Sequence, residues 1–250
     1  MPPGARPSPV GMRRIRASGA ARMTAPEVTL TFDNGPEPDA TPGVLDVLRR
    51  RGLRATFFVI GSKMADPARR ALAERAHAEG HWIGNHGFTH SGPLGARHDP
   101  GHAEAEIGRT QALFGNLSHP DRLFRPVGGG GRIGPHLLSR EARDHLAANR
   151  HTIVLWSAVP GDWRDPEGWP ERALAQCRAQ PRPVVVLHDL PGGAMRHLDG
   201  FLGRLIDLDA RFSQDFPDDC VPMRRGVAAA ALQHHVTPGR EAAHDLPPNH

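Results

Sequence analysis

Two histidines four residues apart, His86 and His90, are the first candidates for chemistry in this sequence. They come directly after an apolar run at residues 82–83, where a strand is expected to end. This spacing lets both imidazoles reach one metal ion, from a helical turn or from a compact loop. The chain contains 16 histidines, so two unrelated surface histidines are the alternative explanation.

An aspartate and an asparagine, Asp33 and Asn34, follow another apolar and β-leaning run over residues 28–32. Two histidines and an aspartate form a standard ligand set for a catalytic divalent metal that leaves positions open to water. Neighbouring acids can divide the work, one binding the metal and the other taking a proton from water, but here only Asp33 is acidic. In the alternative interpretation, Asp33 caps a helix and Asn34-Gly35 forms an ordinary turn. It explains less, because no helix is expected before Thr41.

An arginine, Arg125, ends a third apolar run and precedes the glycine run Gly128–Gly131. An arginine aimed at a carboxylate keeps that carboxylate ionised and fixes its direction. The glycines form either a flexible loop or a place where backbone N–H groups approach a substrate oxygen. They lack the following Lys-Ser/Thr of a phosphate-binding loop.

Asp162-Trp163 and His188 follow the next two apolar runs. A nearby carboxylate stabilises the cationic form of a histidine, which suits a general acid. Taken singly, a histidine such as His188 is more often a hydrogen-bonded core residue than a catalytic one. Asp, His, Arg or Trp at five strand ends indicates one site, because the carboxyl ends of parallel strands meet at one face of an α/β fold.

Helices and strands alternate along the chain. Helices are predicted at Thr41–Arg51, Asp66–Glu79, His102–Phe114, Pro135–Ala148, Glu171–Ala179 and Leu198–Leu208. Strands are predicted at residues 28–33, 55–60, 82–83, 123–125, 152–156 and 184–187. Strands separated by helices imply a parallel sheet. The number of such units favours a distorted, partly open (β/α) barrel of about seven parallel strands.

Composition narrows the function classes. A chain of 250 residues with 38% apolar residues suits one domain. The charge of +4 comes from arginine, since Lys63 is the only lysine, but the arginines are scattered and tyrosine is absent, so nucleic-acid binding is not expected. No run of about 18 apolar residues predicts a membrane span. Cys177 and Cys220 belong to no zinc or redox motif and are predicted to be free thiols.

The two ends of the chain are not expected to belong to the folded domain. Residues 1–25 are predicted to be disordered or a mis-annotated extension, and they contain no continuous apolar segment of a signal peptide, so a cytoplasmic location is expected. Residues 26–222 form the predicted domain, and residues 223–250 a loose tail rich in alanine, histidine and proline. The oligomeric state is not predicted.

The chain resembles the NodB-homology polysaccharide deacetylases, carbohydrate esterase family four, over about residues 26–222. All five family motifs occur in order. They are Thr31–Pro36, usually Thr-Phe-Asp-Asp-Gly-Pro; His86–His90, usually His-Ser/Thr-x-x-His; Arg125-Pro126 with its glycines; Asp162-Trp163; and Leu187-His188.

The resemblance implies hydrolysis of an N-acetyl or O-acetyl group of a carbohydrate by metal-bound water. It implies Asp33 as general base oriented by Arg125, and His188 as general acid tuned by Asp162. The implied metal ligands are Asn34, His86 and His90, holding one divalent ion: zinc, with cobalt or nickel as alternatives. The implied substrate-binding residues are Trp163, Leu187 and Gly128, with the first two shaping the groove for the acetyl methyl.

Three departures from the family pattern bear on metal affinity and substrate choice. Asn34 replaces the usual aspartate ligand, so the metal affinity is expected to fall, whereas water acidification need not fall. Gly87 replaces a Ser/Thr that braces the histidine loop, and Val127-Gly128 replace bulkier residues. Two alternatives therefore stay open: a catalytically silent carbohydrate-binding or regulatory relative, and a hydrolase of a small non-sugar amide.

Overall fold

The structure is a computed structural model that describes residues 25–238. The predicted N-terminal extension lies outside the described residues apart from Ala25, as do the last 12 residues of the predicted tail, 239–250. Within residues 25–238, no helix combines the length and apolar character needed to cross a membrane.

The strands are short, and the first six along the chain are almost entirely buried. They are β1 (Glu27–Asp33), β2 (Thr56–Val59), β3 (Trp82–Asn85), β4 (Leu123–Phe124), β5 (Thr152–Ile153), β6 (Val184–His188), β7 (Arg211–Ser213), β8 (Met223–Arg224) and β9 (Val227–Ala228). Strands such as Val184–His188 are continuous apolar runs rather than alternating ones, because a parallel sheet covered by helices is buried on both faces.

The strands form one sheet that curls into a distorted barrel. Its order is β6-β1-β2-β3-β4-β5-β8-β9, with β7 paired beside β1. Pairing is parallel from β1 to β7 and antiparallel for β8 and β9. A single parallel bridge from Ala158 to Val185 links the segment after β5 back to β6. The predicted barrel of about seven parallel strands is confirmed.

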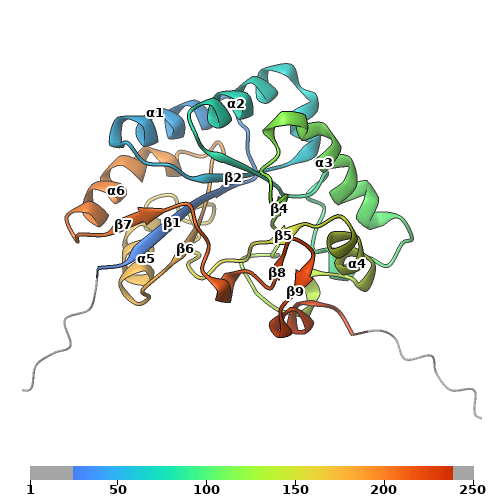
Figure 1. The fold of residues 1–250 in the computed structure, drawn as a ribbon. Coiled ribbons are helices and arrows are strands. Elements are labelled where there is room, and N and C mark those ends of the chain that lie inside the picture. The colour runs from blue at the N-terminus through green and yellow to red at the C-terminus, as the bar shows by residue number, and fades with distance from the viewer. Residues whose placement is uncertain (1–24, 239–250) are drawn as a thin grey trace, which may run out of the picture.

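Helices surround the strands (Figure 1). They are α1 (Thr41–Arg51), α2 (Pro67–Ala78), α3 (Arg109–Phe114), α4 (Arg140–Ala148), α5 (Trp169–Arg178) and α6 (Leu198–Ile206). Local sequence sets the ends of α1: Pro42 lies at its start, and Gly52 ends it with a left-handed φ of 64°. The side chain of Asp66 caps α2 by accepting hydrogen bonds from the N–H groups of Ala68 and Arg69.

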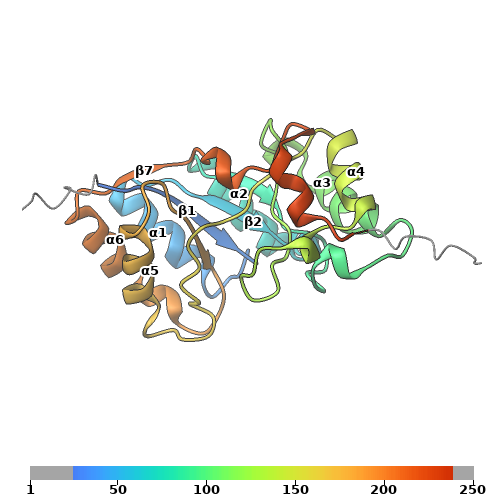
Figure 2. The same ribbon diagram turned by 90° about the horizontal axis from the view of Figure 1, so that it is seen from below.

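Two main hydrophobic clusters flank the strands. Figure 2 shows α1, α5 and α6 gathered at one end of the molecule and α3 and α4 at the other. The buried faces of α1, α5 and α6 pack with β1 and β2 in the first cluster. The buried residues of α4 pack with β4, β5 and the segment after β9 in the second. Both clusters therefore pack helices directly against the strands of the barrel.

Three predicted elements differ from the structure. The predicted helix at Pro135–Ala148 is a 3-10 turn at Pro135–Leu137 followed by α4, because Leu138 is extended and Ser139 caps α4. The predicted helix at His102–Phe114 contains a π-helical turn, Glu104–Gly108. The predicted loose tail is wrong for residues 223–238: β8 pairs with β5, and Leu232 and Val236 are buried in the second cluster.

Candidate active site

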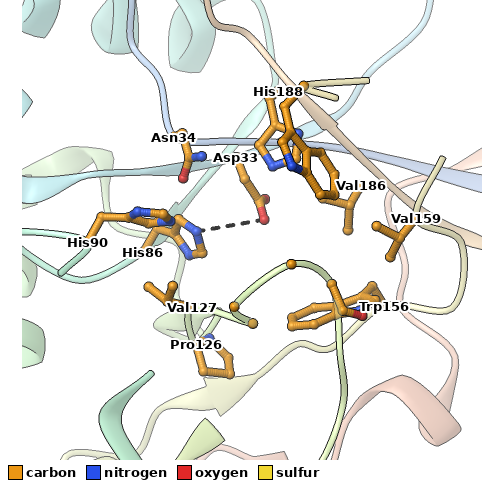
Figure 3. Close-up of a pocket in the computed structure, with 15 residues that line it drawn as sticks. Asp33, Asn34, His86, His90, Pro126, Val127, Trp156, Val159, Val186 and His188 are labelled. Carbon is orange, nitrogen blue, oxygen red and sulfur yellow. Dashed lines mark hydrogen bonds and ion pairs between the residues drawn. The ribbon is translucent and has the colours of Figure 1, made fainter. Parts of the chain in front are cut away.

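The carboxyl ends of neighbouring parallel strands bring the predicted site residues together (Figure 3). Asp33 is the last residue of β1 and lies in register with His188, the last residue of β6. His86 follows β3 directly, and Arg125 follows β4. All of these except Arg125 line one pocket, whose full lining is Asp33, Asn34, His86, His90, Pro126, Val127, Gly128, Gly129, Gly130, Gly131, Trp156, Val159, Trp163, Val186 and His188.

Asp33 is held by a buried arginine. Its Oδ1 accepts a hydrogen bond of 2.9 Å from Nη1 of Arg125, whose side chain is 0% exposed. The same guanidinium donates to Thr31 Oγ1 and to the carbonyl oxygens of Val154 and Leu155. Burial opposes ionisation of Asp33, but the charge of Arg125 and its hydrogen bond outweigh burial and lower the pKa of this carboxyl. Asp33 is thus an oriented carboxylate with its Oδ2 facing the pocket.

His86 is held in one tautomer. Its Nδ1 lies 2.8 Å from the carbonyl oxygen of Arg125, which can only accept a hydrogen bond, so Nδ1 carries the proton. Burial lowers the pKa of His86 to about 4, so the ring is neutral and its Nε2 has a free lone pair. That Nε2 points into the pocket, 3.8 Å from Asp33 Oδ2, and the ring of His90 lies 5.1 Å away between centroids. A second ring nitrogen fixed by a carbonyl is typical of a histidine that binds a metal.

Asn34 supplies a third donor beside the two imidazoles. Its φ of 74° lies in the left-handed region, which asparagine tolerates better than most residues. Figure 3 shows its side chain directed toward Asp33 and the two histidines. Its buried Oδ1 has no hydrogen-bond partner among the residues that the structure describes. An orphaned amide oxygen next to two imidazoles fits a divalent metal ion, because such an ion would satisfy it.

No cluster of three His, Cys, Asp or Glu side chains suited to a metal occurs within residues 25–238. The amide of Asn34 is therefore what completes a three-donor set here. Lys63 braces this residue from behind: its Nζ donates to the carbonyl oxygen of Asn34 at 2.6 Å and pairs with Glu37 at 2.5 Å. This role of the single lysine could not be predicted from the sequence, because the contact joins residues 29 positions apart in the chain.

His188 is paired with a buried carboxylate. Its Nδ1 lies 2.9 Å from Asp162 Oδ1, and its backbone N–H donates to Asp162 Oδ2 at 2.8 Å. Burial disfavours the imidazolium, but the hydrogen bond and charge of Asp162 outweigh burial and raise the pKa of His188. The ring of Trp163 stands edge-on to it at 4.8 Å. His188 therefore has the hydrogen bonding of a general acid whose Nε2 is left for a substrate.

The apolar wall of the pocket differs from the prediction at one residue. Leu187 lies in the hydrophobic core and not in the pocket lining, where Val186 stands instead. Side chains alternate along a strand, so Val186 shares a face with His188 and Leu187 faces the helices. Trp156 and Val159, which sequence reasoning did not assign to the site, complete this wall.

Gly128 lies against Trp156. A Cβ placed on Gly128 would lie 2.6 Å from two atoms of the Trp156 ring, so only glycine fits there without displacing the ring. The Nε1 of Trp156 donates to the carbonyl oxygen of Gly131 at 2.9 Å. The glycine loop is thus laid across the indole, which closes one side of the pocket.

Asp189 is a buried acid beside the site. Its Oδ2 accepts a hydrogen bond of 2.5 Å from Thr41 Oγ1, whereas its Oδ1 has no partner among the described residues. Its carboxyl lies so close to Gly35 that a Cβ there would overlap it. Burial raises the pKa of Asp189 to about 7.

We expect Asp189 to make the stability of the protein pH-dependent. Its folded-state pKa lies above the unfolded value of 3.8, so the folded state keeps a proton that the unfolded state has lost, and stability falls as the pH rises toward 7. Asp189→Asn removes this titration. The free energy of unfolding of the variant minus that of the unmodified chain should increase by about 2.5 kcal/mol from pH 5 to pH 8, measured by urea denaturation. An equal difference at both pH values would contradict this.

The sequence of this chain is similar to those of known carbohydrate deacetylases. Residues 20–145 match the family model for polysaccharide deacetylase. The chain is 36% identical over 182 residues to a chitooligosaccharide deacetylase from Sinorhizobium fredii, covering 71% of this chain and 77% of that protein. It is 28% identical over 183 residues to the peptidoglycan-N-acetylglucosamine deacetylase PgdA from Listeria monocytogenes, covering 73% of this chain but 36% of that protein.

A solved structure is similar as well. A family 4 carbohydrate esterase from Streptomyces lividans, in complex with acetate, superimposes with a TM-score of 0.64 at 26% sequence identity. The match covers 78% of this chain and 96% of the esterase.

Proposed function

This chain belongs to the polysaccharide deacetylase family, and we propose that it hydrolyses the N-acetyl group of an acetylated sugar, with an O-acetyl group as the related substrate. The relatives named above act on chitooligosaccharide and on peptidoglycan N-acetylglucosamine. The observation that carries the proposal is the buried Asp33, whose Oδ1 is held by Arg125 and whose strand neighbour is His188. A fixed base and a fixed acid face one pocket.

The proposal includes one divalent metal ion, zinc first, with cobalt or nickel as alternatives. Asn34 Oδ1, His86 Nε2 and the imidazole of His90 would hold it. When bound, such an ion polarises the acyl oxygen and lowers the pKa of the attacking water toward about 7. An amide ligand carries no charge, so a weaker affinity than that of an aspartate ligand is part of the proposal.

Asp33 is the proposed general base. Its Oδ1 is occupied by Arg125, so the proton of the attacking water goes to Oδ2, the oxygen nearer His86. Arg125 keeps the carboxylate ionised before the reaction, when it must accept a proton. The water oxygen then bonds to the acyl carbon.

His188 is the proposed general acid. As the bond between the acyl carbon and the sugar nitrogen breaks, the imidazolium donates its Nε2 proton to that nitrogen, giving acetate and an amine. Asp162 holds Nδ1–H throughout and so presents Nε2 to the pocket. The N–H groups of Val127 and Gly128 donate no hydrogen bond within residues 25–238 and remain available to the oxygen that gains negative charge.

The pH profile tests this assignment of the acid. The reaction needs protonated His188, so kcat/KM should fall at alkaline pH with a midpoint above 6.5, since Asp162 raises the pKa of His188. In Asp162→Asn the midpoint of this alkaline decrease should move to lower pH, and kcat should fall by about 10²-fold. The matched control is Asp165→Asn in the same loop: this exposed carboxylate pairs with Arg172, and its replacement should leave the midpoint unchanged. An unchanged midpoint in Asp162→Asn would refute the acid role of His188.

A second candidate function, a catalytically silent carbohydrate-binding relative, is favoured by one observation. Asn34 lacks the charge of an aspartate ligand, so a metal ion would have less compensating charge. Retention of a complete base–arginine and acid–carboxylate pair speaks against it, because a silent domain has no use for either.

A further inference from the structure

The rim of the pocket carries an arginine that the proposed reaction does not use. The guanidinium of Arg164 lies 5.4 Å from the centroid of the Trp163 ring. Its Nη2 would lie 2.8 Å from a Cβ placed on Gly130, so it also rests against the glycine loop. Trp163 and Gly130 both line the pocket. Arg164 therefore lies next to two segments of the pocket lining, the Trp163 ring and the glycine loop.

The charge of Arg164 is not neutralised by a neighbour. No acidic side chain pairs with it within residues 25–238. The adjacent acid, Asp165, is engaged by Arg172 at 2.8 Å and by the backbone N–H of Gly168 at 2.9 Å. Within the pocket lining the only acid is Asp33, which pairs with the buried Arg125. The mouth of the pocket is thus electropositive.

The glycine loop beside Arg164 offers backbone donors. Gly129, Gly130 and Gly131 have φ values of 59°, 85° and 81°, a left-handed run that side-chain-bearing residues rarely adopt. Their N–H groups donate no hydrogen bond to any described residue. Consecutive N–H groups in such a turn are suited to an anionic oxygen.

We propose that Arg164 and the Gly129–Gly131 loop form a subsite for a carboxylate carried by the acetylated glycan. The inference rests on the proposed function, since it assumes that an acetylated sugar enters the same pocket. One guanidinium matches the single charge of a carboxylate and can bind both of its oxygens. The substrate class this favours is an acidic glycan, in which a carboxylate-bearing sugar neighbours the sugar that is deacetylated.

A pair of ligands that differ only in charge tests the subsite. One is a tetrasaccharide of alternating N-acetylglucosamine and its 3-O-carboxyethyl derivative, and the other is the methyl ester of the same compound. Binding is followed by tryptophan fluorescence, because Trp156 and Trp163 both line the pocket. The acid is expected to bind about fivefold to tenfold more tightly than its ester.

Matched variants identify the cation. Arg164→Gln should abolish the preference, and Arg164→Lys, which keeps the charge, should retain part of it. Arg178→Gln makes the same charge change on an exposed arginine of α5 and should leave the preference intact. Equal binding of acid and ester by the unmodified chain, no binding of the acid, or a full preference in Arg164→Gln would overturn the subsite.

The same ligands separate this inference from the proposed function. Acetate release from the methyl ester by the unmodified chain reports the chemistry without the carboxylate. Acetate release with no acid preference would overturn the subsite alone. A preference that depends on Arg164, without acetate release from either ligand, would support the subsite and overturn the proposed hydrolysis.

Discussion

Replacing Asp33 by asparagine is expected to lower kcat for acetate release by about 10³-fold or more. The amide cannot accept a proton from the attacking water, and general base catalysis contributes about 10²–10⁴-fold. The three proposed metal donors are untouched, so binding of zinc or cobalt should persist. The measurement is acetate released from acetylated chito-oligosaccharides by protein with a known metal content.

Stability must be followed in the same experiment, because the change leaves the buried Arg125 without its carboxylate. Removing one partner of a buried pair costs about 3–5 kcal/mol, so the assay belongs well below the melting temperature of the variant. Folded Asp33→Asn protein that binds metal and keeps its kcat would show that Asp33 is not the base.

Arg125→Met is expected to destabilise the fold by about 3–5 kcal/mol and to reduce activity as well. Methionine fills much of the volume of the arginine side chain, but it leaves Asp33, which is 4% exposed, without its charged partner. It also removes the hydrogen bonds that Arg125 donates to Thr31 and to two backbone carbonyl groups. Without the guanidinium, burial dominates and the pKa of Asp33 rises, so less base is available near neutral pH. Urea denaturation and kcat/KM against pH check both parts.

The control for Arg125→Met is Arg122→Met, an exposed arginine immediately before β4 whose change should cost less than about 1 kcal/mol. The double variant Asp33→Asn/Arg125→Met should be more stable than Arg125→Met alone, because no unpaired charge remains. A double variant with the full sum of both single losses would show that the two side chains are not energetically coupled.

The edge of the barrel that carries the candidate site could be predicted from the sequence because local signals are strong there. The alternation of apolar runs and helices predicts a parallel sheet, and residues at successive strand ends, such as Asp33 and His188, must then meet. Helix α1 was predicted with the same bounds that it has in the structure, because Pro42 and Gly52 mark its two ends.

The missed elements depend on contacts between distant segments. Strands β7, β8 and β9 have two or three residues each, too few to show a period. They form by pairing with β1, β5 and β8, respectively. Side chains alternate along a strand, so the residue two positions before His188, Val186, is the one expected to share its face, and not Leu187.

Other site features have no sequence signal. The left-handed backbone of Asn34 and its support by Lys63 follow from the packing of the loop after β1. The same holds for Asp189, which is buried against Gly35 because β6 lies beside β1. Such contacts depend on tertiary structure, so composition and spacing could not reveal them.

Metal content and acetate release measured on the same sample test the proposed metal-dependent deacetylation most directly. Protein without a His-tag is dialysed against zinc or cobalt, its bound metal is quantified, and it is assayed on acetylated chito-oligosaccharides. We expect about one equivalent of metal, acetate release that Asp33→Asn abolishes, and tighter metal binding in Asn34→Asp, which restores a charged ligand. Absence of bound metal and of acetate release, with both appearing in Asn34→Asp, would show instead that the native chain is the silent relative.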